Sequence, residues 1–282
     1  ILTEKRRPAP ARQALRQRPV AKTDRRILCV HLPDNVRYIY CIVMFMEIQP
    51  PMKQMGYDRA IVVFSPEGRM YQVEYARKAV EKATTAVGVT FANGIVLVAG
   101  RTLQKLLVPE SVEKISKIDE HIGIASCGIL ADSRVLIDYA RVRAQVNRMT
   151  YNESIEVSSL VKDICDRKQR FTQVGGIRPF GVSLLVAGMN DTPHLFETDP
   201  SGTLREWKAQ AVGRGVKEAK KVLVDEFKDG MAKEKAIDLA LKALKAGERK
   251  LTLRSTEMGI IENGKFLELD RNVLKDAMKK FV

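Results

Sequence analysis

Beyond residue 56, segments with two different repeating patterns of apolar and polar residues follow one another along the chain. Short runs of apolar or alternating residues are typical of β-strands, and longer stretches with apolar residues every three to four positions are typical of helices. The pattern predicts extended segments at residues 58–68, 85–92, 94–99, 111–127, 181–188, 255–262 and 266–269, with further strand pieces up to residue 211. It predicts helices at residues 69–82, 130–148, 154–173, 216–229 and 233–246, and one more at the end of the chain.

The order of these elements indicates the fold class. Asn93-Gly94 and Asn263-Gly264 are dipeptides favoured in tight hairpin turns, so each predicts two neighbouring antiparallel strands. Hairpins, a helix pair, more strands and a second helix pair do not follow the strict strand–helix alternation of a parallel sheet. The sequence therefore predicts an α+β fold in which antiparallel sheets carry helices on their outer sides.

The predicted helix at residues 69–82 has an unusually wide apolar arc. Tyr71 and Tyr75 stand four residues apart, on a face next to the main apolar stripe of Met70, Val73, Ala76 and Val80. A helix that is apolar over so wide an arc usually packs on two sides. This helix therefore suits an interface between subunits.

Composition narrows the class of protein. The chain has 282 residues, of which 45% are hydrophobic and 29% charged, which suits one large domain or two small ones. No apolar run approaches the ~20 residues that a membrane span needs. The four cysteines lie far apart without a CxxC pair, so neither a disulfide framework nor a zinc site is indicated. We expect a globular protein of the cytoplasm without cofactor, metal or membrane contact.

Residues 1–51 differ from the rest of the chain. They hold ten Lys and Arg against four Asp and Glu, which is +6 of the net charge of +14. Their apolar stretch, residues 38–46, is too short for a membrane anchor and lacks the small-residue cleavage site of a secretory signal. We expect residues 1–51 to be a poorly ordered or non-native extension, and residues 52–282 to form one domain.

A nucleic-acid-binding arm is the alternative for residues 1–51. It predicts salt-dependent binding that disappears when these residues are deleted. The domain itself carries a moderate surplus of positive charge. It has no RNP-type aromatic pattern, no paired zinc ligands and no dense basic run. We therefore expect no nucleic acid among the partners of the domain.

Residues 56–76 carry the most specific motif of the chain. The segment reads GYDRAIVVFSPEGRMYQVEYA and resembles the signature of α-type subunits of the proteasome core particle. The resemblance continues through residues 91–94, 112–115, 128, 131–134 and 175–182, and it covers residues 56–282. It implies the four-layer α-β-β-α sandwich of N-terminal-nucleophile hydrolases, in agreement with the order of elements.

The resemblance also implies a function. Subunits of this type form the outer heptameric ring of the particle, carry no peptidase site, and gate the access of substrates. The implied partners are other α subunits in a homo-heptamer, catalytic β subunits, an ATPase activator with C-terminal docking tails, and unfolded protein in transit. The domain has no long acidic tail, which favours an archaeal type of particle with one kind of α subunit.

A threonine-type peptidase, as in the β subunits of the family, is the alternative function. Its nucleophile is the first residue of the mature chain, and the free α-amine serves as the base. Thr84 stands at the corresponding place, but Ala83 precedes it instead of Gly, and Gly100 replaces the acidic partner. Lys114 matches the catalytic lysine. One element of three is insufficient, so we expect catalysis in partner β subunits; self-processing would instead create a new N-terminus at Thr84.

Four residues match the gating cluster of the family: Tyr57, Asp58, Pro66 and Tyr75. Pro66 stiffens a turn that can shift as a unit. Two phenols and one carboxylate can form hydrogen bonds between neighbouring subunits. The alternative is that Tyr75 and Tyr71 are core residues of their helix.

The resemblance places an activator-docking pocket at Lys114, Gly128, Ile129 and Glu74. A lysine offers a point charge to the C-terminal carboxylate of a tail, and Gly128 lets the backbone of the tail approach closely. The alternative is that Lys114 is a solvated strand lysine.

The break at Gly175–Gly181 resembles a contact loop between subunits. Gly175 and Gly176 permit unusual backbone angles, and Arg178 is expected to pair across the ring interface.

Overall fold

We describe the fold from a computed structural model. It describes residues 64–248, 251–268, 274–275 and 278. The contacts divide the chain into two units, Ile1–Met52 and Lys53–Val282. The first unit lies outside the described residues, as do Tyr57, Asp58 and most of the helix predicted at the end of the chain. The structure below is that of the second unit.

Two antiparallel five-stranded sheets form the centre of this unit. The first sheet has the order β10-β9-β2-β1-β8. Its strands are β1 (Ala86–Phe91), β2 (Gly94–Gly100), β8 (Ala209–Val212), β9 (Thr256–Glu262) and β10 (Lys265–Glu268). The second sheet has the order β3-β4-β5-β6-β7. Its strands are β3 (Ile115–Asp119), β4 (Ile122–Gly128), β5 (Val182–Met189), β6 (Pro193–Thr198) and β7 (Leu204–Glu206).

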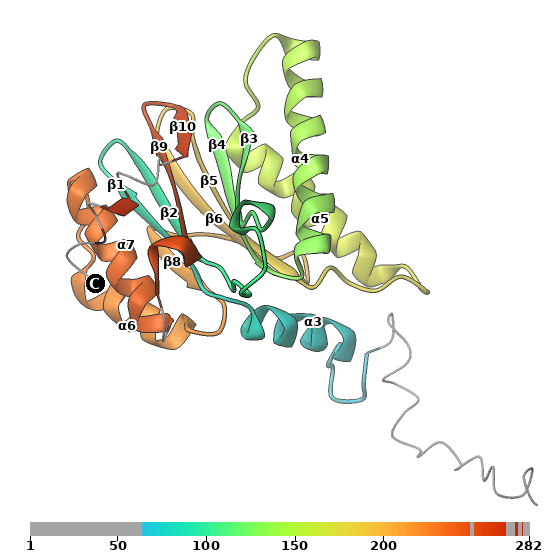
Figure 1. Cartoon of the computed structure of the whole chain (residues 1–282). Helices are drawn as coiled ribbons and strands as arrows, with labels where there is room; N and C mark the ends of the chain where they lie inside the picture. Colours follow the sequence, from blue (N-terminus) through green and yellow to red (C-terminus); the bar gives the residue numbers. More distant parts are fainter. Residues whose placement is uncertain (1–63, 249–250, 269–273, 276–277, 279–282) are drawn as a thin grey trace, which may run out of the picture. The chain divides into compact units, whose positions relative to one another are not determined.

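Two helix pairs cover the outer faces of the sheets (Figure 1). The pair α6 (Val216–Glu226) and α7 (Lys233–Gly247) packs on the first sheet, and the pair α4 (Leu130–Tyr151) and α5 (Val157–Gln173) packs on the second. A third apolar cluster fills the space between the two sheets. The predicted four-layer α-β-β-α sandwich is confirmed. None of the helices in the described part of the chain is long and apolar enough to cross a lipid bilayer.

Helix α3 (Tyr71–Lys82) stands outside the four layers and lies across one end of the sandwich (Figure 1). It buries Val73, Ala76 and Val80 against the sheets. Tyr75, on the neighbouring face, is 44% exposed. The wide apolar arc predicted for this helix is therefore covered on one side by its own chain and exposed on another.

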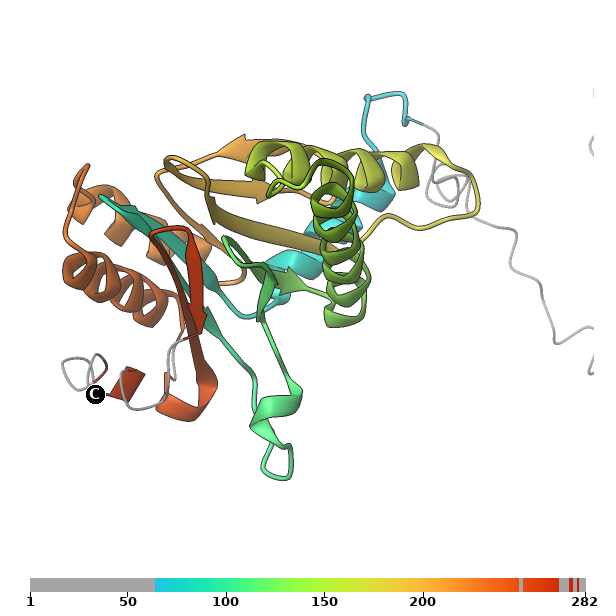
Figure 2. The same cartoon turned by 90° about the horizontal axis from the view of Figure 1, so that it is seen from above.

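Two local predictions were wrong. The run at residues 111–127 is two strands with a turn between them, preceded by a 3-10 turn (Pro109–Ser111) in the loop that projects from the body (Figure 2). The first hairpin turns at residues 92–93 rather than 93–94, because Gly94 already pairs with Phe91. A side chain at Gly94 would place its Cβ 2.0 Å from the Ile261 carbonyl oxygen, so the glycine serves the close approach of β9.

The second hairpin is as predicted. Asn263 and Gly264 have φ angles of 50° and 70°, the left-handed pair that a tight two-residue hairpin turn requires. The short connection aligns Lys265 with Glu262 and so fixes the register of β9 and β10.

Candidate functional site

The signature segment begins, within the described residues, with a closed turn. The Ser65 carbonyl accepts a hydrogen bond from the Gly68 N–H at 2.8 Å, and the Ser65 N–H donates to the Arg69 carbonyl at 3.0 Å. The Arg69 N–H donates to the Ser65 hydroxyl at 3.1 Å. Pro66 occupies the second position, and Gly68 has a φ of 75° that favours glycine. Three hydrogen bonds thus make the predicted turn a compact unit.

A two-pronged ion pair joins this turn to α3. The Arg69 guanidinium donates from Nε to Glu74 Oε1 at 2.8 Å and from Nη2 to Oε2 at 2.5 Å. The hydrogen bond from Arg69 lowers the pKa of Glu74, so the pair stays charged at neutral pH. One residue later, Tyr75 points its ring outward beside the Lys78 ammonium, which lies 5.6 Å from the ring centre. The alternative of Tyr75 as a core residue is wrong, because the side chain is exposed.

Residues 83–85 connect α3 to β1 and are held by the segment that follows β8, the strand next to β1, and by the end of α7. The Arg214 N–H donates to the Ala83 carbonyl at 2.9 Å. Glu248, which follows α7, accepts hydrogen bonds at Oε1 from the Thr85 N–H at 2.7 Å and from the Thr85 hydroxyl at 2.9 Å. The same carboxylate receives the Arg214 guanidinium. We call residues 83–85 the α3–β1 junction.

Lys114 reaches into this junction from the start of β3. Its side chain is buried, and its ammonium donates to the carbonyl and the hydroxyl of Thr84, both at 2.7 Å. Burial lowers the pKa of Lys114, although the carboxylates of Glu248 and Glu257 oppose this shift from a distance. The alternative of a solvated strand lysine is wrong. No ion pair joins Lys114 to a carboxylate within the part of the chain that the structure describes.

Gly128 and Ile129 lie beside Lys114 at the same end of the second sheet. Gly128 has a φ of 131°, and a Cβ there would come within 2.2 Å of the Gly181 carbonyl oxygen. Ile129 donates its N–H to that carbonyl at 3.0 Å and keeps 40% of its surface exposed. Three of the four predicted docking residues are thus neighbours. Glu74, the fourth, sits nearer the other end of α3, about 9 Å along the helix from Val80.

The predicted ring-contact loop joins α5 to β5. Gly175 and Gly176 are exposed, and Gly176 has a φ of 82°. Arg178 already has a partner within its own chain, because its guanidinium donates to both carboxylate oxygens of Asp132, at 2.6 and 2.5 Å. The side chain of Arg178 remains 60% exposed, so a second partner can still reach it.

Two features of the junction had no signal in the sequence. Glu248 and Arg214 stand far from the signature along the chain and belong to no motif. The sequence matched Thr84 and Lys114 separately to positions of the threonine site, and the structure adds the contact between them. In the structure, however, Thr84 is an internal residue whose preceding carbonyl is engaged by Arg214. The Glu248 side chain lies next to Gly100, the position where an acidic partner was expected.

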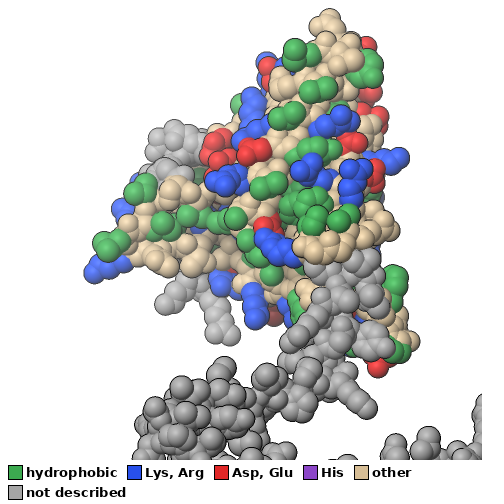
Figure 3. All heavy atoms as spheres, turned by 90° about the vertical axis from the view of Figure 1, so that its right-hand side faces the viewer, with side chains coloured by type: hydrophobic (Ala, Val, Ile, Leu, Met, Phe, Trp, Pro, Cys, Tyr) green, Lys and Arg blue, Asp and Glu red, His purple; other side chains and the backbone are tan. Residues whose placement is uncertain are grey.

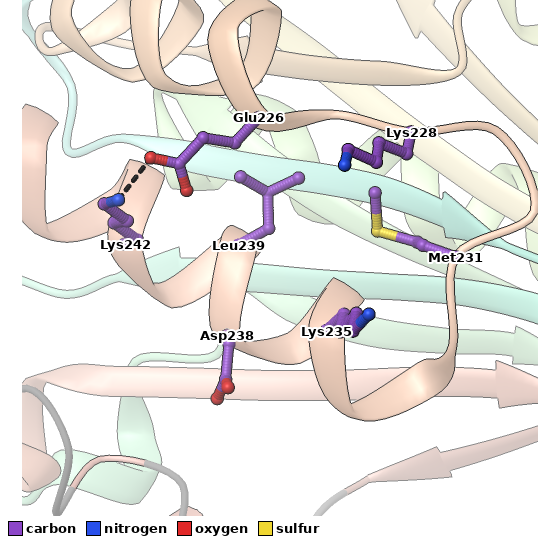
Figure 4. A pocket seen from close by; sticks show the side chains of 7 residues that line it. All are labelled: Glu226, Lys228, Met231, Lys235, Asp238, Leu239 and Lys242. Carbon is purple, nitrogen blue, oxygen red and sulfur yellow. Dashed lines mark hydrogen bonds and ion pairs between the residues drawn. The ribbon is translucent and has the colours of Figure 1, made fainter.

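The hollow between α6 and α7 is a separate feature of about 290 Å³ (Figure 4). It is lined by two apolar residues, Met231 and Leu239, and by the charged residues Glu226, Lys228, Lys235, Asp238 and Lys242. None of the predicted site residues lines it. Within the described residues, no group of three His, Cys, Asp or Glu could hold a metal ion.

Comparison with known proteins identifies the segments described above. Residues 57–79 match the N-terminal signature of A-type proteasome subunits, and residues 80–261 match the proteasome subunit family. The chain is 54% identical over 216 residues to a proteasome alpha subunit of Methanoregula boonei, covering 76% of this chain and 90% of that protein.

Two further relatives carry the same name. The Methanoculleus marisnigri protein is 50% identical over 236 residues, covering 82% of this chain and 98% of that protein. The Thermococcus sibiricus protein is 52% identical over 217 residues, with coverages of 77% and 83%. The matched signature is the α type, which decides against the threonine peptidase. The chain therefore belongs to the proteasome subunit family, in its α type, the subunits of the non-catalytic outer ring.

Proposed function

We propose that this chain forms a homo-heptameric outer ring in the cytoplasm, stacks on β subunits, gates the passage of unfolded protein, and docks the C-terminal tails of an ATPase activator. The observation that carries the proposal is the closed turn at residues 65–69 joined to α3. Both lie within the α-type signature, and both stand outside the four layers that form the core.

The gating role rests on the stiffness of this turn. Pro66 moves with the turn because three hydrogen bonds close it, and the Arg69–Glu74 pair transmits its position to α3. Tyr75 is exposed and can meet a neighbouring subunit. Tyr57 and Asp58 would complete this cluster.

The ring and the stacked β subunits require exposed surfaces that another subunit can cover. Apolar side chains lie exposed among charged ones on the helix face of the second sheet (Figure 3). On α4, the spacing of Val135, Val142, Val146 and Met149 places them in one stripe, and Met149 is 86% exposed. Such a stripe suits contact with a helix of another subunit. The loop with Gly175, Gly176 and Arg178 is a further contact surface in this proposal.

The docking role rests on the charge of Lys114. Its ammonium is buried, and its hydrogen bonds go to two uncharged oxygens of Thr84. A buried charge without a counter-ion is costly, so the terminal carboxylate of a tail would be a favourable partner. The glycine at Gly128 serves the close approach of the Gly181 carbonyl within the chain itself, and Ile129 and Glu74 would line the pocket.

The test is Lys114→Ala in the ring assembled with β subunits. We expect native mass measurement to show a heptameric α ring, and we expect the variant to lose activator-stimulated protein degradation while small-peptide cleavage continues. Lys117→Ala, an exposed lysine three residues along in β3, is the matched control and should keep full stimulation.

Two outcomes would contradict the proposal. A chain that stays monomeric at micromolar concentration contradicts the ring. Unchanged stimulation in assembled Lys114→Ala particles contradicts the docking role.

A further inference from the structure

A histidine at the β7 edge of the second sheet lies between a hydroxyl and a carboxylate. His194 Nδ1 is 2.6 Å from Glu206 Oε1, and His194 Nε2 is 3.0 Å from the Thr192 hydroxyl oxygen. Thr192 is exposed, and the side chains of His194 and Glu206 are 35% and 52% exposed. We call these three residues the β6 triad. A small molecule in solution can therefore reach it.

The packing of the second sheet fixes the imidazole of the β6 triad. His194 pairs with Gly188 of β5, and the register of β6 with β7 sets Glu206 opposite Phe196. The buried Phe196 ring lies nearly parallel to the imidazole, with ring centres 6.0 Å apart and an angle of 15° between the planes. Two strands and one aromatic contact thus hold the imidazole in the orientation that both of its hydrogen bonds require.

The carboxylate decides which nitrogen of the imidazole carries the proton. A charged carboxylate can only accept hydrogen bonds, so His194 Nδ1 donates to Glu206. In the neutral ring, Nε2 then has a lone pair and accepts the hydrogen of the Thr192 hydroxyl. With this order of contacts, an imidazole acts as general base toward a hydroxyl, and the carboxylate stabilises the imidazolium that forms.

We propose that Thr192 is a nucleophile that accepts acyl groups from activated esters, with His194 as its general base and Glu206 as the positioning residue of the imidazole. Thr192 Oγ1 attacks the ester carbonyl and forms a new C–O bond, while His194 Nε2 takes the hydroxyl proton. The bond to the leaving oxygen then breaks, and the imidazolium returns the proton to it. Water, activated in the same way, hydrolyses the acyl-threonine. This activity is independent of the ring, gating and docking roles proposed above.

Exposure sets the class of substrate. Because Thr192 lies at the surface, water stabilises the oxyanion of the tetrahedral intermediate. Water does this less well than the preorganised donors of a closed site, so the leaving group must depart easily. Aryl esters meet this condition and amides do not. The activity is therefore acyl transfer from small activated esters and excludes the cleavage of peptides.

The test uses the purified full chain without β subunits, because their threonine sites would react with the same reagent. The chain is incubated with p-nitrophenyl acetate, the release of nitrophenolate is followed, and acid-quenched samples are mapped by peptide mass spectrometry. Hydroxylamine removes an acetyl group from a threonine oxygen and leaves acetyl-lysine intact, which separates the two products. The exposed Lys117 reports the reaction that needs no triad. Ser201 and Thr203, whose hydroxyls contact each other at 3.0 Å and touch no histidine in the described part of the chain, are the control hydroxyls.

We expect a hydroxylamine-sensitive acetyl group on Thr192 at a level about tenfold above that on the control hydroxyls, less than a positioned base gives in a closed site. His194→Ala should lower this label to the control level. Glu206→Gln should lower it about three- to tenfold, in line with the loss of one hydrogen bond to a charged group. Thr192→Ser keeps the hydroxyl and should keep the nitrophenolate release above the lysine background, whereas Thr192→Val should lose it.

Either of two results overturns the proposal. Equal nitrophenolate release by His194→Ala and the unmodified chain shows that the imidazole is not the base. Equal release by Thr192→Val and Thr192→Ser shows that the hydroxyl is not the nucleophile. The second comparison decides even where the acyl-threonine hydrolyses before it can be trapped, because release counts every turnover.

Discussion

Two lysines of this chain lie inside the protein and make the same pair of hydrogen bonds. Lys114 donates to the carbonyl and hydroxyl of Thr84. Lys168 is fully buried and donates to the Val182 carbonyl at 3.0 Å and to the Thr198 hydroxyl at 2.7 Å. Each ammonium thus has one backbone carbonyl and one threonine hydroxyl as acceptors.

The two lysines differ in the elements that supply their hydrogen-bond acceptors. Lys168 projects from α5, and its acceptors are the start of β5 and the end of β6, two adjacent strands of the sheet on which α5 packs. Lys114 has both acceptors on one residue that follows a helix outside the layers. Burial and hydrogen bonding alone therefore do not mark a lysine as functional. What differs is whether the acceptors belong to the packed layers or to the α3–β1 junction outside them.

The largest effect that tests this comparison concerns stability. Lys168→Ala leaves a cavity and removes the donor to the Val182 carbonyl, and we expect it to lower the free energy of unfolding by about 2–4 kcal/mol. Lys168→Met fills the same space without a charge and should cost less than about 1 kcal/mol, as apolar replacements of buried ions often do. Chemical denaturation at fixed protein concentration measures both variants.

A second measurement compares activator stimulation of Met variants in the particle assembled with β subunits. Lys168→Met should keep activator stimulation, whereas Lys114→Met should lose it. A loss of stimulation in both Met variants would show that the two lysines do not differ in the way the structure indicates.

A smaller effect is the pH dependence of stability. Burial lowers the pKa of Lys168 to about 8, from an ordinary value of 10.5. Below pH 8 both the folded and the unfolded chain hold the proton, so the full cost of burying the charge is present. Between these two values the unfolded chain binds more protons, so the free energy of unfolding rises with pH, by up to about 1.4 kcal/mol per pH unit.

The measurement compares unmodified chain and Lys168→Met between pH 8 and pH 9. We expect the unmodified chain to gain about 1 kcal/mol relative to the variant over this unit. Burial raises the pKa of the Cys165 thiol, next to Lys168, to about 11, and this acts in the opposite direction at higher pH. Both proteins carry Cys165, so the difference between them isolates Lys168; parallel curves would contradict the assignment.

The sequence carried a signal for each lysine, but of different kinds. Lys114 stands in a motif, and the family resemblance predicted a role for it but not its hydrogen bonds to Thr84. Lys168 stands on the apolar stripe of α5 with Leu160, Ile164 and Cys165, where periodicity demands a buried residue and the residue type argues against one. The conflict between position and residue type was the available indication of a buried charge.

The helices followed from periodicity, because each hides one face. The central strands, such as β2 and β5, are buried on both faces and followed from their short apolar runs. What did not follow depends on contacts between distant segments. The turn before Gly94 lies one residue earlier than predicted because β9 approaches there. The strands β3 and β4 were predicted as one segment because the residues between them include no glycine, proline or asparagine to mark a turn. Glu248 joined the junction only through the packing of α7 on the first sheet. No local pattern encodes such a partner.

The smallest expected effect concerns an ion pair between α3 and the residue that follows β6, near Lys168. Arg77 on α3 donates from Nη2 to Asp199 Oδ2 at 2.8 Å, and Asp199 follows Thr198, the acceptor of Lys168. The Arg77 side chain is 47% exposed, so solvent screens the pair. We expect Arg77→Gln to cost less than about 1 kcal/mol of stability, as exposed pairs do. Chemical denaturation at fixed protein concentration, beside Lys168→Ala, measures this cost.

This variant tests how α3 is held on the sandwich. If Arg77→Gln cost as much stability as Lys168→Ala, the ion pair would hold the helix more than the buried side chains of Val73, Ala76 and Val80 do. A small cost leaves that packing as the main support of α3, and it leaves Lys168 with the packing of the layers.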